Sequence, residues 1–429
     1  MKIILKQINL LNPEQNLNKK DDLLIENGVI KQIGGLKETD FKSSVVYEFE
    51  NKFCSPGFLD MHVHLREPGR EDEETVETGT NAAAAGGFTG VACMPNTTPD
   101  IDSAEIVRFI KEKAAGRLVD VYPVACATLH RKGDSLSPMY ELFEAGAVAF
   151  SDDGVAIKTA GVLRNAFEYS RNFGTAIIEH CEEESLADGS MNESLTSTIL
   201  GLPAIPNVAE DLIVARDLMM AEFTGGKIHI AHISSKNAVD FVRQAKKKGI
   251  KVTAEVTPHH FTLSDESLKS FDTNYKMNPP LRTRDDVEAV IEGLKDGTID
   301  CIASDHAPHS IEEKEMEFIF APNGILGLET ELGLAVTELV NKKHISLSQL
   351  VGKFAINPRK ILNLQVPQIN PGEIANLTIF DPELIWTVDV SKFKSKSKNS
   401  PFDMRLLTGK SVAVINNHKM FFEDRFFDI

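Results

Sequence analysis

Two histidines and an arginine stand close together in the segment DMHVHLREPG, residues 60–69. The apolar run 53–59 before them predicts a buried strand. Because side chains alternate faces along a strand, His62 and His64 point the same way, and Arg66 follows on that face. Two imidazoles on one face form half of a metal site, and the arginine could hold an anionic substrate beside it. An isolated H-x-H pair is weak evidence, so the rest of the chain must supply the other ligands.

Most histidines of this chain stand at the ends of predicted strands. Nine of the 12 do so, where chance would scatter them. The polar residues at these ends are His62, His64, Asn96, Asp152, Asp153, Glu179, His180, His229, His232, His259, His260, Asp305, His306 and His309. The carboxyl ends of the strands of a parallel barrel meet at one face, so we expect these side chains to lie together.

Five of these residues exceed the needs of a single zinc ion. Imidazole and carboxylate ligands suit zinc or a similar divalent ion, and a catalytic zinc usually keeps three protein ligands and an open position. The five are His62, His64, His180, His232 and Asp305. A second metal is therefore expected, with Asp152 or Asp153 as the bridge, and Asp152 suits a supporting role better. Two metals would make a bridging hydroxide available and polarise a carbonyl, and Asp305 could carry its proton to a leaving amide nitrogen.

Four further histidines are expected to support the site or to pack. His229 and His232 have opposite parity on one predicted strand, so we assign His229 a structural role. His259, His260 and His306 are expected to lie behind the ligands or in the core. The five cysteines are scattered, with no C-x-x-C pair, and we expect them to be small buried hydrophobes in a reducing cytosol.

The elements that must position these residues alternate between strands and helices. Short apolar runs occur at 58–64, 88–95, 119–128, 147–152, 175–181, 227–233, 251–257 and 299–304. Amphipathic patterns between them include 103–115, 207–223, 236–248 and 284–295. Strand followed by helix, repeated about eight times, predicts an α/β fold with a (β/α)8 TIM barrel. A doubly wound open sheet is the alternative, but no glycine-rich dinucleotide fingerprint follows the first strand.

Both ends of the chain show short strands and turns. Strands are predicted at 3–8, 22–26, 29–33, 411–415 and 419–422, and residues 372–382 predict a strand followed by a turn at Asp381-Pro382. We expect residues 1–54 and 367–429 to form one small β domain, and residues 55–366 to form a metal-dependent barrel. The basic run SKFKSKSK, residues 391–398, is expected to be a solvated loop.

Composition and charge exclude several classes of protein. The chain has 429 residues, 42% hydrophobic and 25% charged, which is ordinary for a soluble globular protein. Its net charge of −17 argues against a nucleic-acid surface, so an anionic substrate must be attracted by local positive charge. No apolar run is long enough to cross a bilayer, and the N-terminal residues lack the features of a signal peptide. We expect a cytoplasmic protein without a membrane partner.

With these residues assembled, the chain resembles the dihydroorotases of the amidohydrolase superfamily, in particular their class I bacterial branch. The resemblance runs nearly end to end. It rests on the motifs DMHVHLREPG (60–69), TGTNAAAAGGFTGVACMPNTTP (78–99), FSDDG (150–154), EHC (179–181), HIS (232–234), TAEVTPHHF (253–261), KMNPPLR (276–282), ASDHAPH (303–309) and GLET (327–330). HVHLREPG and MNPPLR are specific to this group, beyond the H-x-H that the superfamily shares.

The resemblance implies a role for each residue of the site. The implied zinc ligands are His62, His64 and Asp305 for one ion and His180 and His232 for a second, with Asp153 and a hydroxide as bridges. The implied substrate contacts are His64, Arg66, Asn96, Asn278 and His309, with the backbone at Asn323 and Gly324. In related hydantoinases, dihydropyrimidinases and allantoinases a carboxylated lysine usually bridges the metals. Here Lys158 lies five residues after Asp153 and is expected at the surface.

The activity that the resemblance implies is the zinc-dependent, reversible cyclisation of N-carbamoyl-L-aspartate to L-dihydroorotate in pyrimidine synthesis. The hydroxide would attack the ring amide carbonyl, with Asp305 as general acid and base. A hydantoinase or allantoinase is the alternative within the same class, although its substrates do not require the LREPG and MNPPLR residues. A non-catalytic scaffold for aspartate carbamoyltransferase should have lost metal ligands, which this chain keeps. A homodimer, and association with aspartate carbamoyltransferase, are further implications of the resemblance.

Overall fold

Eight parallel strands form the central sheet of the computed structural model, which describes residues 1–429. They are β6 (Phe58–Val63), β7 (Phe88–Cys93), β8 (Asp120–Cys126), β9 (Ala149–Ser151), β10 (Ile177–Glu179), β13 (Ile228–Ile230), β14 (Val252–Val256) and β15 (Cys301–Ile302). Each pairs in parallel with the next, from β6 to β15. A parallel bridge between Val63 and His306, with His64 N donating to His306 O at 2.9 Å, connects the two ends of the sheet. The predicted barrel is confirmed.

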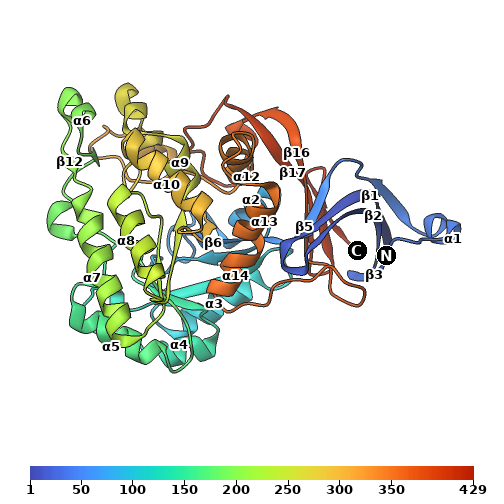
Figure 1. Cartoon of the computed structure of the whole chain (residues 1–429), viewed down its shortest axis with the longest axis horizontal. Helices are drawn as coiled ribbons and strands as arrows, with labels where there is room; N and C mark the ends of the chain where they lie inside the picture. Colours follow the sequence, from blue (N-terminus) through green and yellow to red (C-terminus); the bar gives the residue numbers. More distant parts are fainter.

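Helices cover the outside of the barrel (Figure 1). Those that follow the strands are α2 (Val76–Gly86), α3 (Ala104–Ala114), α4 (Met139–Ala145), α5 (Ala160–Ser170), α7 (Val208–Thr224), α8 (Lys236–Lys247), α10 (Arg284–Asp296), α12 (Glu331–Ala335), α13 (Leu347–Val351) and α14 (Asn357–Ile361). The connections contain α6 (Leu195–Leu200), α9 (Pro258–Thr262), α11 (Ile311–Lys314) and the short strands β11 (Met191–Asn192) and β12 (Ala204–Ile205). Short 3-10 segments occur at Pro13–Gln15, Leu129–Arg131, Glu184–Leu186, Asp265–Ser270, Thr273–Tyr275 and Val390–Lys392, and π-helical turns at Val336–Val340 and Gly352–Ile356. None of the helices combines the length and hydropathy that a bilayer span needs.

Helix α8 shows why these segments are helical. Its buried residues, Ala238, Val239, Val242 and Ala245, recur at spacings of three and four and therefore lie on one face. Ser235 caps the helix, since its hydroxyl accepts a hydrogen bond from Ala238 N. The charged residues of the helix occupy the opposite face, so burial of one stripe fixes the helix against the barrel.

Both ends of the chain contribute to a second, nine-stranded sheet, seen at the right of Figure 1. Its strands are β1 (Lys2–Asn12), β2 (Leu17–Glu26), β3 (Val29–Ile33), β4 (Val45–Glu48), β5 (Phe53–Pro56), β16 (Leu377–Thr387), β17 (Leu406–Asn416), β18 (Lys419–Phe422) and β19 (Arg425–Asp428), with the short helix α1 (Glu38–Lys42) beside them. The two ends of the chain meet where β5 pairs antiparallel with β16, for example Cys54 with Ile379. The expected β unit built from both termini is confirmed.

Strand β16 continues past the turn that the sequence predicts. Asp381 and Pro382 lie within the strand, and the pairing of β16 with β17 changes register between Asp381 and Ile385. Proline has no N–H to donate, so a strand accommodates it where the hydrogen-bond ladder is interrupted. The prediction of a turn at this position is therefore wrong.

The basic loop 391–398 is less solvated than predicted. Ser395 and Ser397 are buried, although the lysines between and after them are exposed. The Ser395 hydroxyl bonds to Glu74 Oε2, and the Ser397 hydroxyl donates to Glu73 O at 2.7 Å. The loop thus packs against the connection between β6 and α2, and the expectation of a solvated connection is wrong for these two serines.

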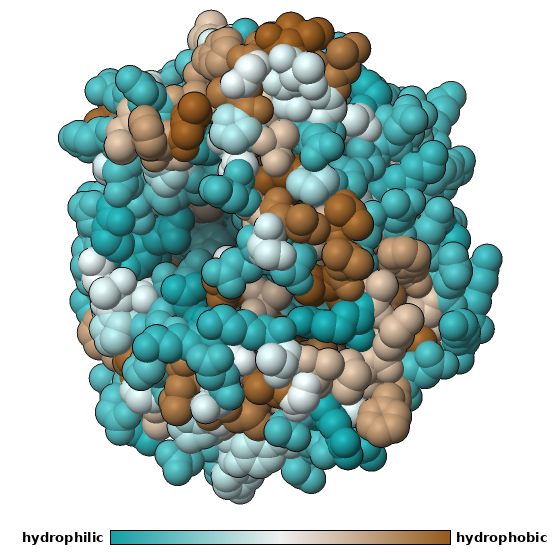
Figure 2. Space-filling view, turned by 90° about the vertical axis from the view of Figure 1, so that its left-hand side faces the viewer, coloured by the Kyte–Doolittle hydropathy of each residue, from teal (hydrophilic) through white to brown (hydrophobic).

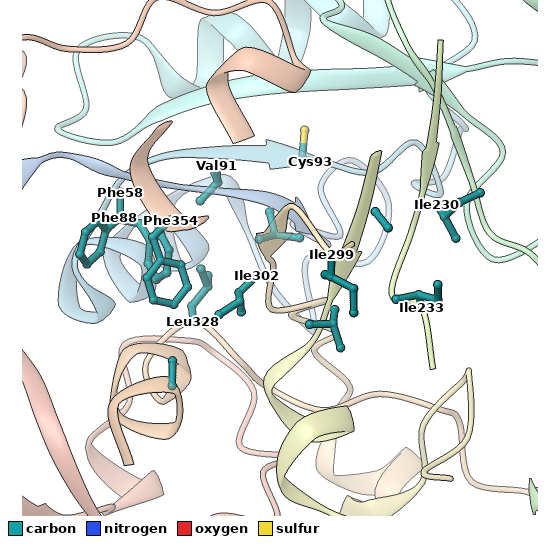
Figure 3. Close-up of a cluster of buried hydrophobic side chains, with 14 of the residues drawn as sticks. Phe58, Phe88, Val91, Cys93, Ile230, Ile233, Ile299, Ile302, Leu328 and Phe354 are labelled. Atoms are coloured by element: carbon teal, nitrogen blue, oxygen red, sulfur yellow. The ribbon is translucent and has the colours of Figure 1, made fainter. Parts of the chain in front are cut away.

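Aromatic packing closes the amino end of the barrel (Figure 3). Phe58 and Phe88 begin β6 and β7, and Phe354 comes from the π-helical turn before α14. Their ring centroids lie 5.3–6.1 Å apart, and all three side chains are fully buried. Phe380 of β16 packs on Phe58 at 5.6 Å and joins the β sheet to the barrel. Because this end is filled with apolar side chains, polar chemistry is left to the opposite, carboxyl end.

Candidate active site

Six buried metal-type side chains come together at the carboxyl ends of the barrel strands. They are His62 in β6, His64 after it, Asp153 after β9, His180 after β10, His232 after β13 and Asp305 after β15. The sequence places them on five different strands, and the barrel brings all of them to one point, as expected from the strand-end positions. We call them the six-residue group.

Short contacts link the members of this group. His64 Nε2 lies 2.9 Å from Asp305 Oδ1, and His62 Nε2 lies 3.3 Å from Asp153 Oδ1 and 3.5 Å from Asp305 Oδ1. His180 Nδ1 lies 2.9 Å from His232 Nε2, which is 3.8 Å from Asp153 Oδ1. Asp153 therefore stands between the pair His62 and His64 and the pair His180 and His232.

The donor atoms of the group fit divalent metal ions. Four of these buried atoms have no hydrogen-bond partner: His62 Nε2, Asp153 Oδ1, His180 Nε2 and His232 Nδ1. Buried polar atoms without partners are costly, and a metal ion would satisfy them. The ligand atoms form three overlapping triplets, each within 4.8 Å: His62, His64 and Asp153; Asp153, His180 and His232; His62, His232 and Asp305. This is a candidate metal-binding site.

Glu255, a residue that the sequence reasoning missed, orients His62. Its Oε1 lies 2.6 Å from His62 Nδ1, which leaves His62 Nε2 facing the other ligands. Its Oε2 lies 3.1 Å from Nε2 of His229, so His229 supports the site from outside the six-residue group. Burial raises the pKa of Glu255, but the neighbouring imidazoles outweigh this effect and lower it to about 2. A carboxylate inside an apolar strand was the signal that could have identified it, since a buried charge needs a partner.

Asp152 and Lys158 lie away from the metal-type atoms. The Asp152 carboxylate accepts hydrogen bonds from Thr128, at 2.9 Å from its backbone N and also from its hydroxyl. Burial raises the pKa of Asp152 to about 6, against the effect of these bonds. The Lys158 side chain is 51% exposed and lies 3.9 Å from Asp134 at the surface. These positions agree with the supporting role expected of Asp152 and the surface position expected of Lys158.

Three further strand-end histidines, His259, His260 and His306, are buried outside the group. His306 Nε2 lies 3.3 Å from Glu74, and its Nδ1 accepts from Gly327 N at 3.2 Å. His260 contacts Thr257 and a backbone carbonyl, and His259 is buried beside it. The five cysteines are buried and free, as predicted.

A cavity of about 400 Å³ opens beside the six-residue group. Its lining is His64, Arg66, Asn96, Asp153, Gly154, His180, His232, Met277, Asn278, Asp305, Ala307, His309, Pro322 and Asn323. Gly324, predicted from the resemblance, is not among them. It lies behind the wall, where a Cβ would stand 2.6 Å from His309 Cδ2, so the position requires glycine. The neighbouring Asn323 contributes its carbonyl, 2.8 Å from His309 Nε2.

Arg66 provides a positive charge at the wall of this cavity. Its Nε donates to Pro308 O at 3.1 Å and lies 3.1 Å from Glu73 Oε2, and its Nη2 lies 3.4 Å from His309 Nε2. Glu73 also contacts His309 Nδ1 at 2.9 Å and so fixes both side chains. Burial lowers the pKa of Arg66, and the negative charge of Glu73 raises it. The net effect is a pKa below the ordinary arginine value.

Two asparagines contribute amide groups to the same cavity. Asn96 Oδ1 lies 2.8 Å from His64 Nδ1, and its Nδ2 donates to Asp153 Oδ2 at 3.3 Å. Asn278 Nδ2 donates to Glu182 at 3.1 Å, whereas its buried Oδ1 has no partner. A ligand donor could satisfy that oxygen.

Three residues of the site have a left-handed backbone. The φ angles are 58° at Arg66, 30° at His232 and 47° at Asp305. Residues other than glycine adopt this region at a cost, and such strain tends to collect at functional sites. The fold thus holds these side chains where the ordinary strand conformation would not.

Comparison with known proteins agrees with this geometry. The family described as Dihydro-orotase-like matches residues 51–238. A dihydroorotase of Acetivibrio thermocellus is 48% identical, over 97% of this chain and 97% of its own length. A dihydroorotase of Syntrophus aciditrophicus is 46% identical, over 99% of this chain and 100% of its own. Among solved structures, the L-hydantoinase (dihydropyrimidinase) of Arthrobacter aurescens superposes with a TM-score of 0.87 at 26% identity, covering 98% of this chain and 96% of that protein.

Proposed function

The chain belongs to the dihydroorotase family, and on this premise we propose that it interconverts L-dihydroorotate and N-carbamoyl-L-aspartate. It is a cyclic amidohydrolase that opens and closes a ring amide. The observation that carries this proposal is the six-residue group with its unpartnered donor atoms, open to a cavity that presents the Arg66 guanidinium. A set of metal-binding side chains beside a guanidinium suits a small cyclic amide that bears a carboxylate.

The donor set supports two zinc ions per chain. His62, His64 and Asp305 would hold one ion, His180 and His232 the other, and Asp153 would bridge them. Asp153 belongs to two of the three ligand triplets, which is the property that a shared ligand needs. When bound, such ions polarise an amide carbonyl and lower the pKa of nearby water.

Asp305 is the residue proposed to move the proton. Its Oδ1 lies 2.9 Å from His64 Nε2, and it lines the cavity where the amide would bind. Burial raises the pKa of Asp305, but His62 and His64 outweigh this effect and hold it below its usual range. Asp305 is therefore ionised and has a lone pair available for a proton, which it would return to the ring nitrogen as that atom leaves.

Arg66, Asn96, Asn278, His309 and His64 are proposed to bind and orient the substrate, with the backbone at Asn323. The Arg66 guanidinium would pair with the substrate carboxylate, and the Asn278 Oδ1 without a partner would accept from a ring N–H. Gly324 would act indirectly, because its lack of a side chain allows His309 to approach.

The Arg66→Ala substitution should raise KM by roughly 10- to 100-fold with a smaller change in kcat, the usual cost of one charged hydrogen bond. Steady-state kinetics with dihydroorotate would measure this. Arg70→Ala is the matched control, since Arg70 pairs with the same Glu73 at 3.1 Å but is 42% exposed. A loss confined to kcat would contradict the binding role.

A substrate panel tests the proposed activity. Dihydroorotate, hydantoin and allantoin would be supplied in turn, and loss of the ultraviolet absorbance of dihydroorotate would be followed beside product analysis for the others. We expect turnover of dihydroorotate only. Turnover of the neutral rings in its place would assign the chain to the hydantoinase or allantoinase class. No turnover at all would favour a scaffold for aspartate carbamoyltransferase.

A homodimer is the proposed assembly, and the outer face of α7 supports it. Val208, Leu212, Met219 and Phe223 recur along this helix and are each at least 44% exposed, while its opposite face is buried in the barrel. Figure 2 views the molecule from the α6–α7 side and shows apolar side chains among the polar ones. A helix that is apolar on both faces is typically covered on both faces. In a dimer with a two-fold axis, the exposed apolar face of α7 in each copy would be covered by the same face of the other copy.

Sedimentation would test this assembly. We expect a dimer mass at micromolar concentration, shifted toward the monomer by Phe223→Asp. The control is Ile385→Asp, because Ile385 is an apolar residue of similar exposure on β16 in the second sheet. A wild-type monomer would contradict the proposal. The same run with aspartate carbamoyltransferase added tests association with that enzyme.

The protein is proposed to work in the cytoplasm, in pyrimidine synthesis. The proposed division of the chain is a barrel over residues 55–366, with a β domain of residues 1–54 and 367–429. The aromatic contact between Phe58 and Phe380 would then lie at their junction.

A further inference from the structure

The loop that follows β8, residues 127–134, packs against the turn that carries Asp153. Arg131 reaches across from this loop with a forked contact. Its Nη1 donates to the backbone carbonyl of Asp153 at 2.9 Å, and its Nε donates to Asp100 Oδ1 at 2.7 Å. The Arg131 side chain is 25% exposed, so this ion pair is shielded from water on most sides. The contact joins the segments that follow three successive barrel strands, β7, β8 and β9.

Several bonds hold the loop in a conformation that is costly for its residues. His130 and Arg131 both have left-handed backbones, with φ of 55° and 52°. The carboxylate of Asp102 accepts from His130 N at 3.2 Å and lies 2.9 Å from its ring Nδ1. Thr128 bonds to Asp152, the residue beside Asp153. The loop is therefore held on two sides, by Asp102 in the segment after β7 and by Asp152 beside Asp153.

The main chain at Asp153 needs an anchor of this kind. An aspartate side chain is short, so the position of its carboxylate follows the position of its backbone. The next residue, Gly154, has φ of 85° and little steric resistance to other φ values, so this glycine does not by itself fix the peptide between the two residues. Arg131 is the one group that donates to the carbonyl of Asp153. On the other side of the residue, Asp153 N donates to Ser151 Oγ at 3.0 Å, and the carboxylate accepts from Asn96 Nδ2 at 3.3 Å. Loss of the Arg131 bond would leave the carbonyl without a donor and would loosen the backbone that aims the carboxylate at His62 and His232.

We propose that Arg131 is a positioning residue that fixes the Asp153–Gly154 peptide and thereby keeps the Asp153 carboxylate between the two histidine pairs. The inference rests on the proposed function, in which Asp153 bridges two metal ions. Arg131 does not line the cavity, so it acts through Asp153 and not on the substrate. Its guanidinium suits the task because a planar fork can hold Asp100 and a carbonyl at the same time, which an ammonium cannot do in fixed geometry.

The test compares zinc release from three variants of the zinc-loaded protein. Arg131→Met keeps the apolar stem of the side chain and removes both donors. Arg131→Lys keeps the charge and loses the fork. Lys132→Met is the matched control, because Lys132 is the next residue, carries the same charge and is exposed. Release would be followed as zinc passes to a chromogenic chelator, with kcat, KM and the unfolding temperature of the metal-free proteins measured in parallel.

Supporting partners of metal ligands typically change metal affinity or activity by about 10- to 100-fold. We therefore expect Arg131→Met to release zinc at least about 10-fold faster than the wild type and to lose kcat with little change in KM. The zinc release rate of Arg131→Lys should fall between those of the wild type and Arg131→Met. The rate of Lys132→Met should match the wild type. The metal-free proteins should unfold at similar temperatures, which a merely structural role would not predict.

Other outcomes separate this inference from the proposed function. A wild-type release rate in Arg131→Met would overturn the role of Arg131 and leave the metal site intact. If that variant does not fold, a wild-type rate in Arg131→Lys would overturn it instead. A wild-type protein that retains no zinc would contradict the proposed metal site itself, before any variant is compared.

Discussion

Asp305→Asn should lower kcat by about 10³-fold, within the range that a positioned general acid and base contributes, while most of the bound metal stays in place. Asparagine keeps the shape of the side chain and one ligand oxygen, but it cannot take or return a proton. The Asp305 carboxylate has His64 at 2.9 Å and lies at the cavity wall, where the leaving nitrogen would be. Single-turnover kinetics together with elemental analysis of the same sample would measure both effects.

Asp134→Asn serves as the control for this substitution, since the Asp134 side chain is 68% exposed and remote from the six-residue group. It should behave as the wild type does. Retained turnover in Asp305→Asn would remove Asp305 from the proton-transfer role. Loss of most of the metal would show instead that its main contribution is as a ligand.

Asp153→Ala should have an effect of similar size through a different cause. We expect the variant to retain about one metal or fewer per chain and to lose turnover by about 10³-fold, because one residue is shared by two ligand triplets. Metal content after dialysis, measured beside kcat, would check this. The loss should not be restored by raising the substrate concentration, since Asp153 is not proposed to bind the substrate.

Lys158→Ala is the informative control for Asp153. Its side chain is 51% exposed, and the structure places it near Asp134 at the surface. We expect full activity and full metal content from this variant. If Lys158→Ala lost its metal and Asp153→Ala kept it, the bridging ligand would be the lysine, and the proposed centre would have to be redrawn.

The sequence was sufficient to predict the barrel and the residues that converge in it. Short apolar runs between amphipathic segments indicate buried strands and helices, and parallel strands in a barrel place their ends together. His62, His180 and His232 are far apart in the chain, yet position at a strand end was enough to predict their proximity. The strands β9 and β15 are shorter than the apolar runs that predicted them. The runs extend further because apolar residues beyond the strand ends are also buried.

Other features depend on contacts that no local pattern contains. Glu255 resembles any acidic residue until His62 and His229 are placed beside it. Ser395 and Ser397 form part of a polar, basic run, and only the position of the β6–α2 connection buries them. Arg131 lies five residues beyond the end of β8, and its role depends on a backbone carbonyl, which carries no sequence signal. These are long-range packing effects, which alternation and spacing do not encode.

Metal reconstitution would show whether dihydroorotate turnover depends on two bound zinc ions. The purified protein would be stripped with a chelator and titrated with zinc, and ring opening of dihydroorotate would be measured after each addition. We expect no turnover in the stripped protein and a rise that saturates at about two zinc ions per chain, the occupancy of a two-metal site. Full turnover by the stripped protein, or saturation with zinc and no turnover of dihydroorotate, would contradict this expectation.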